Sequence, residues 1–140
     1  MAVTIKAPVA QVWPWLVQMG CDRAGWYSWD HLDNAGRPSA DRIHPEWQHI
    51  APGDHLASKP GGDTWFQVAT LEPEQFLGLR ASLDLLGRPY DPAATPPRYY
   101  SDSLRGFQLT EPTPGRTDPE GGVRCTSAPG RSVASVWNAW

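Results

Sequence analysis

The sequence predicts an α+β domain built on one antiparallel sheet, and three observations lead to this fold class. Several short segments alternate apolar and polar residues, as half-buried strands do. Only the turn signals Pro60-Gly61-Gly62 and Glu72-Pro73-Glu74 separate the middle segments, whereas parallel pairing needs crossovers of a dozen or more residues. Near the N-terminus the apolar spacing changes to that of a helix. The predicted strands cover residues 2–6, 55–58, 64–71, 75–83 and 104–110.

The first predicted helix runs from Pro8 to Met19 and follows the first strand directly. Proline suits the first turn of a helix, and Gly20 is a stop signal. The apolar stripe at i, i+3, i+4 and i+7 consists of Val9, Val12, Trp13 and Leu16. Pro14 lies inside this segment and lacks the N–H of a regular helix, a defect that costs about 3 kcal/mol. We therefore expect a kink or a break there.

A second short helix is predicted over residues 26–35, with Trp26, Trp29 and Leu32 on one side. The segment 37–53 is interrupted by prolines and glycines, which favours an ordered loop. Its Ile43 and Trp47 are expected to pack against the domain.

The strand at 64–71 is expected to have cover on both faces. Strict alternation directs Trp65, Gln67, Ala69 and Leu71 to one face and Phe66, Val68 and Thr70 to the other. The proline-rich segment 88–98 is expected to be a long loop within the domain, because another strand follows it.

The domain organisation divides at residue 110. Residues 1–110 form the interpretable domain, and residues 111–140 form a tail in which 14 of 30 residues are Pro, Gly, Ser or Thr. Near its end, Val133, Val136, Trp137 and Trp140 repeat the helical spacing, which indicates a short terminal helix.

Composition excludes several classes of partner. The net charge is −3 and no basic run exceeds a pair, so we expect no nucleic-acid partner. Nowhere do 18 consecutive apolar residues occur, so we expect no membrane-spanning segment. Cys21 and Cys125 lie far apart and form no metal or disulfide motif, so a reduced, cytoplasmic setting is expected.

Three segments carry a resemblance to a known superfamily: IKAPVAQVWPWLVQMG, RAGWYSWDHLDNAG and SADRIHPEWQHIAPGD. They resemble bacterial SRPBCC (START-like) proteins of the polyketide cyclase/dehydratase-like kind, over about residues 3–110. This resemblance implies a helix-grip fold, in which a curved antiparallel sheet wraps a long C-terminal helix and encloses a hydrophobic cavity. Residues 111–140 lack such a long helix, so here the C-terminal helix is expected to be short or missing.

The candidate ligand-binding residues are Trp26, Tyr27, Arg42, Glu46 and Trp47. They lie in the two segments most specific to the resemblance, and they combine large apolar area with a few polar groups, as ligand pockets do. The alternative interpretation of the tryptophans and Tyr27 is core packing. For Arg42 and Glu46 the alternative is an ion pair that fixes the loop.

Other chemistry receives little support from the sequence. His31, His44, His49 and His55 form no metal-binding motif, so neither a metal nor a cofactor is predicted. There is no G-x-S-x-G motif, and Cys21 is interpreted as structural. Tyr99 and Tyr100 follow the long loop, where they either gate a cavity or simply pack.

Three functional hypotheses remain open at this point. The first is binding of a small hydrophobic molecule between the sheet and the C-terminal helix, which the resemblance implies. The second is a polyketide cyclase- or dehydratase-like enzyme in which Tyr27, Arg42 or Glu46 polarises a carbonyl or moves a proton. The third is a truncated fragment without a function of its own, whose exposed sheet face is covered in a homodimer.

Overall fold

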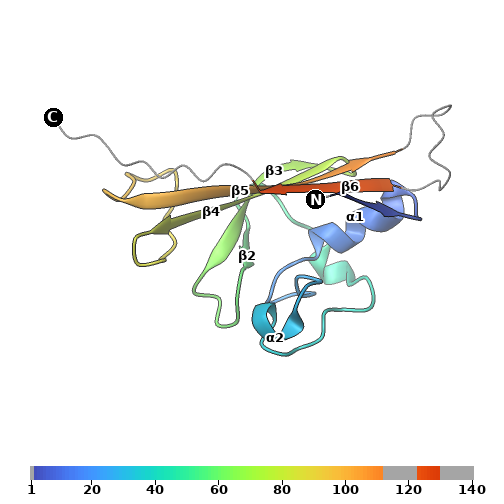
Figure 1. Cartoon of the computed structure of the whole chain (residues 1–140), viewed down its shortest axis with the longest axis horizontal. Helices are drawn as coiled ribbons and strands as arrows, with labels where there is room; N and C mark the ends of the chain where they lie inside the picture. Colours follow the sequence, from blue (N-terminus) through green and yellow to red (C-terminus); the bar gives the residue numbers. More distant parts are fainter. Residues whose placement is uncertain (1, 112–122, 130–140) are drawn as a thin grey trace.

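The computed structural model describes residues 2–111 and 123–129. One six-stranded sheet, in which every neighbouring pair is antiparallel, organises the chain (Figure 1). The strand order across it is β1-β6-β5-β4-β3-β2. The elements in chain order are β1 (Ala2–Ile5), α1 (Val9–Val17), α2 (Asp30–Asp33), the 3-10 turn η1 (Pro45–Trp47), β2 (His55–Ala57), β3 (Trp65–Glu72), β4 (Phe76–Asp84), β5 (Tyr100–Thr110) and β6 (Val123–Pro129). The predicted α+β class and the antiparallel sheet are confirmed.

β6 is the strand that the sequence analysis did not predict. It lies within the Pro/Gly/Ser/Thr-rich tail and pairs with β5 on one side and with β1 on the other. This pairing brings the N-terminal strand into the sheet, so the sheet extends beyond residue 110. The terminal helix expected near residues 133–140 lies outside the described residues. Among the helices that the structure describes, none has the length and apolarity needed to cross a bilayer.

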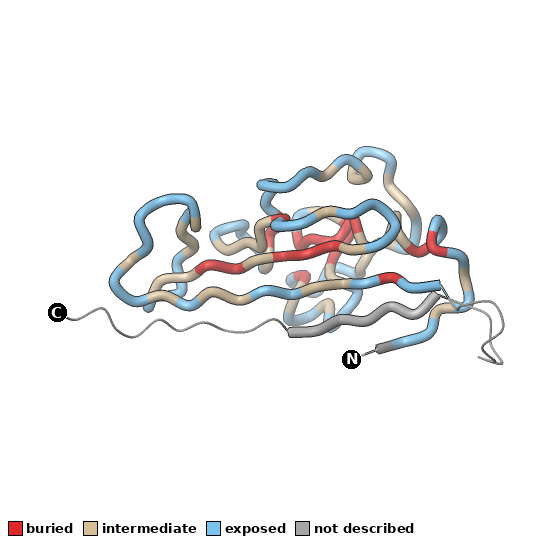
Figure 2. Tube along the Cα trace, turned by 90° about the horizontal axis from the view of Figure 1, so that it is seen from above, coloured by how far each residue is buried: buried red, intermediate tan, exposed pale blue. Residues whose placement is uncertain are grey.

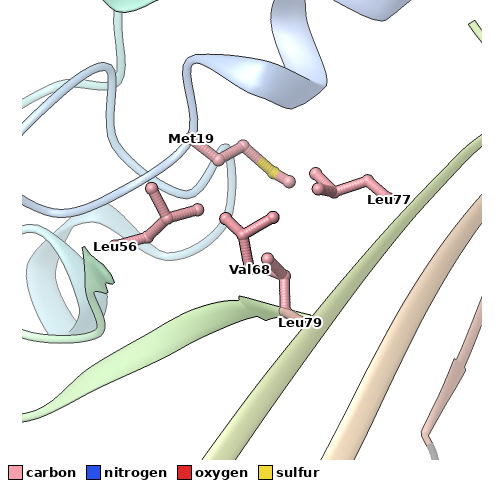
Figure 3. Close-up of a cluster of buried hydrophobic side chains, with 5 residues drawn as sticks. All are labelled: Met19, Leu56, Val68, Leu77 and Leu79. Atoms are coloured by element: carbon pink, nitrogen blue, oxygen red, sulfur yellow. The ribbon is translucent and has the colours of Figure 1, made fainter. Parts of the chain in front are cut away.

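The helices lie together on one side of the sheet, and β2 bends toward them (Figure 1). The buried residues gather in the middle of the molecule, whereas the loops at its ends are exposed (Figure 2). The main cluster joins β2, β3 and β4 to the end of the α1 segment and consists of Met19, Leu56, Val68, Leu77 and Leu79 (Figure 3). A second cluster consists of Val9, Val12 and Leu109. Half-buried Trp13 and Leu16 pack against both clusters, as the apolar stripe predicts.

α1 continues through Pro14 and ends at Val17, so of the kink or break expected there, the break does not occur. The proline stands in the last turn, where its missing N–H removes only the hydrogen bond to the carbonyl of Ala10. The carbonyl of Pro14 accepts a hydrogen bond of 3.2 Å from Gln48 Nε2. The end of α1 is therefore bonded to the loop that precedes β2.

Of the helix predicted over residues 26–35, the structure contains only the single turn of α2. Tyr27 has a φ of 52°, in the left-handed region, which is incompatible with a continuous right-handed helix from Trp26. Trp29 and Leu32 are 76% and 70% exposed, so their predicted inward stripe is wrong. Only Trp26 of that set packs against the main cluster.

The alternation predicted for β3 is correct up to Val68 and wrong beyond it. A register shift between Val68 and Thr70 marks a β-bulge against β4. An extra residue in one strand reverses the face of every later side chain. Leu71 accordingly packs with Val68 in the main cluster and not on the face of Trp65.

Truncation of Leu79 tests the main cluster. Leu79 is fully buried, so Leu79→Ala is expected to lower the free energy of unfolding by about 2–5 kcal/mol through lost burial and a cavity. Leu86→Ala, at a 76% exposed position, is the matched control and should change it by less than about 0.5 kcal/mol. Urea denaturation measures both, and equal effects would contradict the placement of the core.

Candidate functional site

The buried amide of Gln18 organises the segment that contains most of the sequence-predicted site residues. Gln18 caps α1 and is 0% exposed. Its Nε2 donates to the hydroxyl of Tyr27 at 2.5 Å and to the carbonyl of Arg42 at 3.1 Å. Its Oε1 accepts from the backbone N–H of His44 at 3.0 Å and from Gln48 Nε2 at 3.3 Å. The amide thus uses both of its donor hydrogens and accepts two bonds.

Trp26 and Tyr27 point to different environments. The indole of Trp26 donates to the carbonyl of Ala57 at 3.1 Å and contacts Phe66 edge to face at 5.3 Å between ring centroids. Tyr27 is 40% exposed and contacts Trp15 edge to face at 5.8 Å. Partial burial raises the pKa of Tyr27, and the Gln18 bond opposes this shift only in part.

Arg42, Glu46 and Trp47 lie along the loop that Gln18 fixes. The side chains of Arg42 and Glu46 are exposed. Glu46 Oε1 lies 3.2 Å from His44 Nδ1, and hydrogen bonds from its own backbone and from His44 lower its pKa. The ring of Trp47 lies 4.3 Å from the ring of His44, and its carbonyl accepts a hydrogen bond from Arg23.

The structure therefore brings Tyr27 and the backbone of Arg42 together at Gln18, but it does not gather the five predicted side chains around one cavity. None of the five lines either of the two pockets described below. Their role in ligand binding stays a prediction.

A pocket of about 130 Å³, which we call the β-face pocket, lies on the sheet and under the loop that follows β4. It is lined by His55, Trp65, Gln67, Arg80, Ser82, Tyr90, Asp91 and Pro92. Three strands and one loop thus contribute to it, and its lining combines aromatic rings with hydrogen-bonding groups.

Strand register explains why the β2, β3 and β4 residues meet. His55 pairs with Gln67, and Gln67 pairs with Arg80, so these three side chains share one face of the sheet. Arg80 and Ser82 alternate with Leu79 along β4, and Leu79 belongs to the main cluster. The β-face pocket therefore lies on the face opposite that cluster.

The turn after β4 brings the loop back over this face. The carboxylate of Asp84 accepts from the backbone N–H groups of Leu86 and Arg88 at 2.8 and 2.9 Å, and it pairs with the Arg88 guanidinium at 2.7 Å. Hydrogen bonding from the Arg88 backbone, more than the Arg88 charge, lowers the pKa of Asp84. The backbone N–H of Tyr90 then donates to the carbonyl of Ser82 at 3.1 Å, which fixes Tyr90 beside β4.

Beneath this loop, Arg80 forms a two-pronged ion pair with Asp102 of β5. Arg80 Nε donates to Asp102 Oδ1 at 2.7 Å, and its Nη2 bonds to Oδ2. Ser82 donates to the same carboxylate at 3.0 Å. The Arg80 bond lowers the pKa of Asp102 against the opposing effect of burial, and it raises the pKa of Arg80. Such paired bonds fix the geometry of both groups.

Aromatic rings form the other part of the wall. His55 stacks on Trp65 with a centroid distance of 4.7 Å and an interplanar angle of 20°. Tyr90 meets Tyr100 edge to face at 5.6 Å. Partial burial raises the pKa of Tyr90, with a further contribution from the Asp102 charge, so its hydroxyl keeps its proton at neutral pH.

Sequence reasoning missed this pocket, although one signal was present. In the segment FLGLRASLD, Arg80 and Ser82 are polar residues on one face of a largely apolar strand. Asp102 precedes the predicted strand at 104–110, and the structure includes it in β5 opposite Ser82. Of the two aromatics considered as a gate, Tyr100 contacts the pocket residue Tyr90.

A metal centre has no support in the part of the chain that the structure describes, since no three His, Cys, Asp or Glu side chains there form a group able to hold an ion. Comparisons with protein-family models, with curated proteins and with solved structures found no match. The interpretation of the site therefore rests on its own geometry.

Replacing the buried amide tests its organising role. Gln18→Met keeps the approximate size but removes hydrogen bonds to Tyr27, Arg42, His44 and Gln48. Each buried group left without a partner costs about 1–3 kcal/mol, so denaturation should show a loss of at least ~2 kcal/mol. Gln11→Met on the exposed side of the same helix is the control. A loss below ~1 kcal/mol at Gln18 would refute the assignment.

The Arg80–Asp102 pair predicts a specific pH dependence. The folded-state pKa of Asp102 lies below its unfolded value of about 3.9, so its stabilising effect is complete above that value and is lost as pH falls through the folded pKa. Asp102→Asn should be less stable than wild type at pH 7, and the difference should narrow below about pH 4. Denaturation at several pH values measures this, with exposed Asp41→Asn as control. A difference independent of pH would contradict the pairing.

Proposed function

We propose that this chain binds a small, neutral aromatic molecule in the β-face pocket. The observation that carries the proposal is the convergence on one concavity of a stacked aromatic pair, a tyrosine and an arginine that Asp102 holds in place. Small-molecule sites in proteins combine apolar walls with a few placed polar groups in this way.

The size of the pocket supports a ligand, or a ligand portion, of about one ring. Its volume of about 130 Å³ is close to the ~150 Å³ of an engineered apolar cavity that binds benzene. The ring of Trp65 offers a flat contact surface, and offset or edge-to-face aromatic contacts contribute about 0.5–1.5 kcal/mol beyond burial.

The charges of the pocket disfavour an anionic ligand, because Asp91 adds a carboxylate to the lining. Asp102 already compensates the guanidinium of Arg80, so a ligand carboxylate would have to compete with it. Tyr90, whose side chain is hydrogen-bonded to Ser82, and Gln67 contribute neutral hydrogen-bonding groups to the lining. A hydroxyl or amide on the ligand matches them better than an ion does.

We further propose that the fold is a variant of the helix-grip fold. The antiparallel order of the sheet, with two short helices between β1 and β2, is compatible with the SRPBCC resemblance. A small hydrophobic ligand also agrees with what that resemblance implies. Our proposal differs in the position of the ligand, which we place on the sheet face opposite the main cluster.

Titration with phenol, benzamide and benzoate, followed by calorimetry, tests the proposal. We expect saturable 1:1 binding of the two neutral compounds and at least ten-fold weaker binding of benzoate. The carboxylate of benzoate would have to compete with Asp102 for the guanidinium of Arg80. Trp65→Leu should weaken phenol binding at least ten-fold through the loss of its aromatic wall.

Trp29→Leu is the matched control, because Trp29 is 76% exposed and lies outside the pocket. Circular dichroism establishes that both variants fold. Equal binding by wild type and Trp65→Leu, or an equal loss in both variants, would contradict the location of the site, and tighter binding of benzoate would contradict its neutrality.

A further inference from the structure

A second pocket, which we call the arginine pocket, has a different chemistry. It has a volume of about 80 Å³ and is lined by Cys21, Arg23, Gly25, Asn34, Arg37 and Pro38. It shares no residue with the β-face pocket. Two arginines line one small concavity, and its lining contains no Asp or Glu.

Backbone carbonyls hold both guanidinium groups in place. Arg23 donates to the carbonyl of Trp47, and Arg37 Nη2 donates to the carbonyl of Cys21 at 2.6 Å. A guanidinium carries five N–H donors, so each of these bonds leaves most of the group available. Within the described ranges no buried side-chain N or O of a residue that is itself buried or half-buried lacks a hydrogen-bond partner, which covers Arg23, and Arg37 is itself exposed, so solvent or a ligand reaches it.

The positive charge of the pocket is not paired directly. In contrast to Arg80 and Arg88, neither Arg23 nor Arg37 has a carboxylate oxygen within 4.0 Å among the residues that the structure places. Burial lowers the pKa of Arg23, and the charges of Asp22 and Asp54 offset this only in part. A half-buried cation that lacks a bonded counter-ion is stabilised by a bound anion.

The remaining lining is already fixed. The amide of Asn34, 2% exposed, donates to Asp30 Oδ1 and Ser39 Oγ at 2.7 and 2.9 Å and accepts from the N–H of Trp26. A Cβ at Gly25 would lie 2.6 Å from both Asn34 Nδ2 and Ser39 Oγ, so only glycine fits there. These contacts hold Asn34 and Gly25 in place in the lining, which lowers the entropy cost of binding.

We propose that the arginine pocket binds a tetrahedral oxyanion, a phosphate or sulfate group that is either free or at the end of an organic molecule. Planar guanidinium groups bond such oxygens in pairs. The pocket has room for one such group but not for a nucleotide. The charges of Asp22 and Asp54 act on Arg23 and oppose an anion there, so the affinity is expected to be moderate.

Calorimetric titration of the whole chain with sodium phosphate, against sodium chloride at the same ionic strength, tests the proposal. We expect saturable 1:1 binding of phosphate and none of chloride. Arg37→Gln should weaken phosphate binding at least ten-fold, and Arg37→Lys should weaken it less, because it keeps the charge but not the two-pronged geometry. Arg98→Gln, an equal charge change at an exposed position outside the pocket, should leave it unchanged.

Phenyl phosphate distinguishes the two sources of the oxyanion. Tighter binding of phenyl phosphate than of phosphate, measured in the Trp65→Leu variant so that the β-face pocket does not contribute, identifies the end of an organic ligand, and equal binding identifies the free ion. Circular dichroism and urea denaturation verify that the variants fold. Absence of saturable phosphate binding by the wild-type chain, or an equal loss in Arg37→Gln and Arg98→Gln, would overturn the proposal.

Discussion

The structure depends on one buried amide. Residues 37–53 contain little regular structure, so their backbone groups need partners that a helix or a sheet would otherwise supply. Gln18, at the end of α1, provides them by bonding to His44 and Arg42 across the interior. The same side chain bonds the Tyr27 hydroxyl, so a single residue connects α1 to the two segments that precede β2. Because Met19 follows it directly in the main cluster, polar anchoring and apolar packing act on the same point of the chain.

The sheet separates two environments through the alternation of its side chains. Leu77 and Leu79 of β4 face the helices and are fully buried, whereas Arg80 and Ser82 face the opposite side. The half-buried charge of Arg80 is tolerated there because Asp102, on the neighbouring strand, is bonded to it in a fixed geometry. The loop after β4 then covers this polar strip instead of a helix. A pocket results where a sheet face is covered by a single loop, since one loop cannot fill the space that a helix would.

The sequence predicted those parts of the fold that local pattern controls. The strands before residue 85 and the N-terminal helix follow from alternation, turn residues and the apolar stripe. β6 escaped prediction because its partners β1 and β5 supply its stability, and its own composition resembles a loop. The role of Gln18 was not predicted, because a polar residue at a helix end is expected to be exposed. Only the packing of the loop around His44, 26 residues later, buries it. The β-bulge after Val68 was not predicted, because it is defined only by the pairing of β3 with β4.

The candidate sites show the same limit in chemical terms. Arginines that look alike in the sequence lie in two different environments in the structure. Arg80 has a carboxylate 22 residues away directly across the β4–β5 pair, so its charge is compensated and its pocket suits a neutral ligand. Arg23 and Arg37 are held by carbonyl groups instead, which orient a guanidinium without cancelling its charge, so their pocket suits an anion. The arginines differ in the hydrogen-bond partner that the fold places beside each of them. The ligand chemistry of each pocket can therefore be inferred only once strand register and loop position are known.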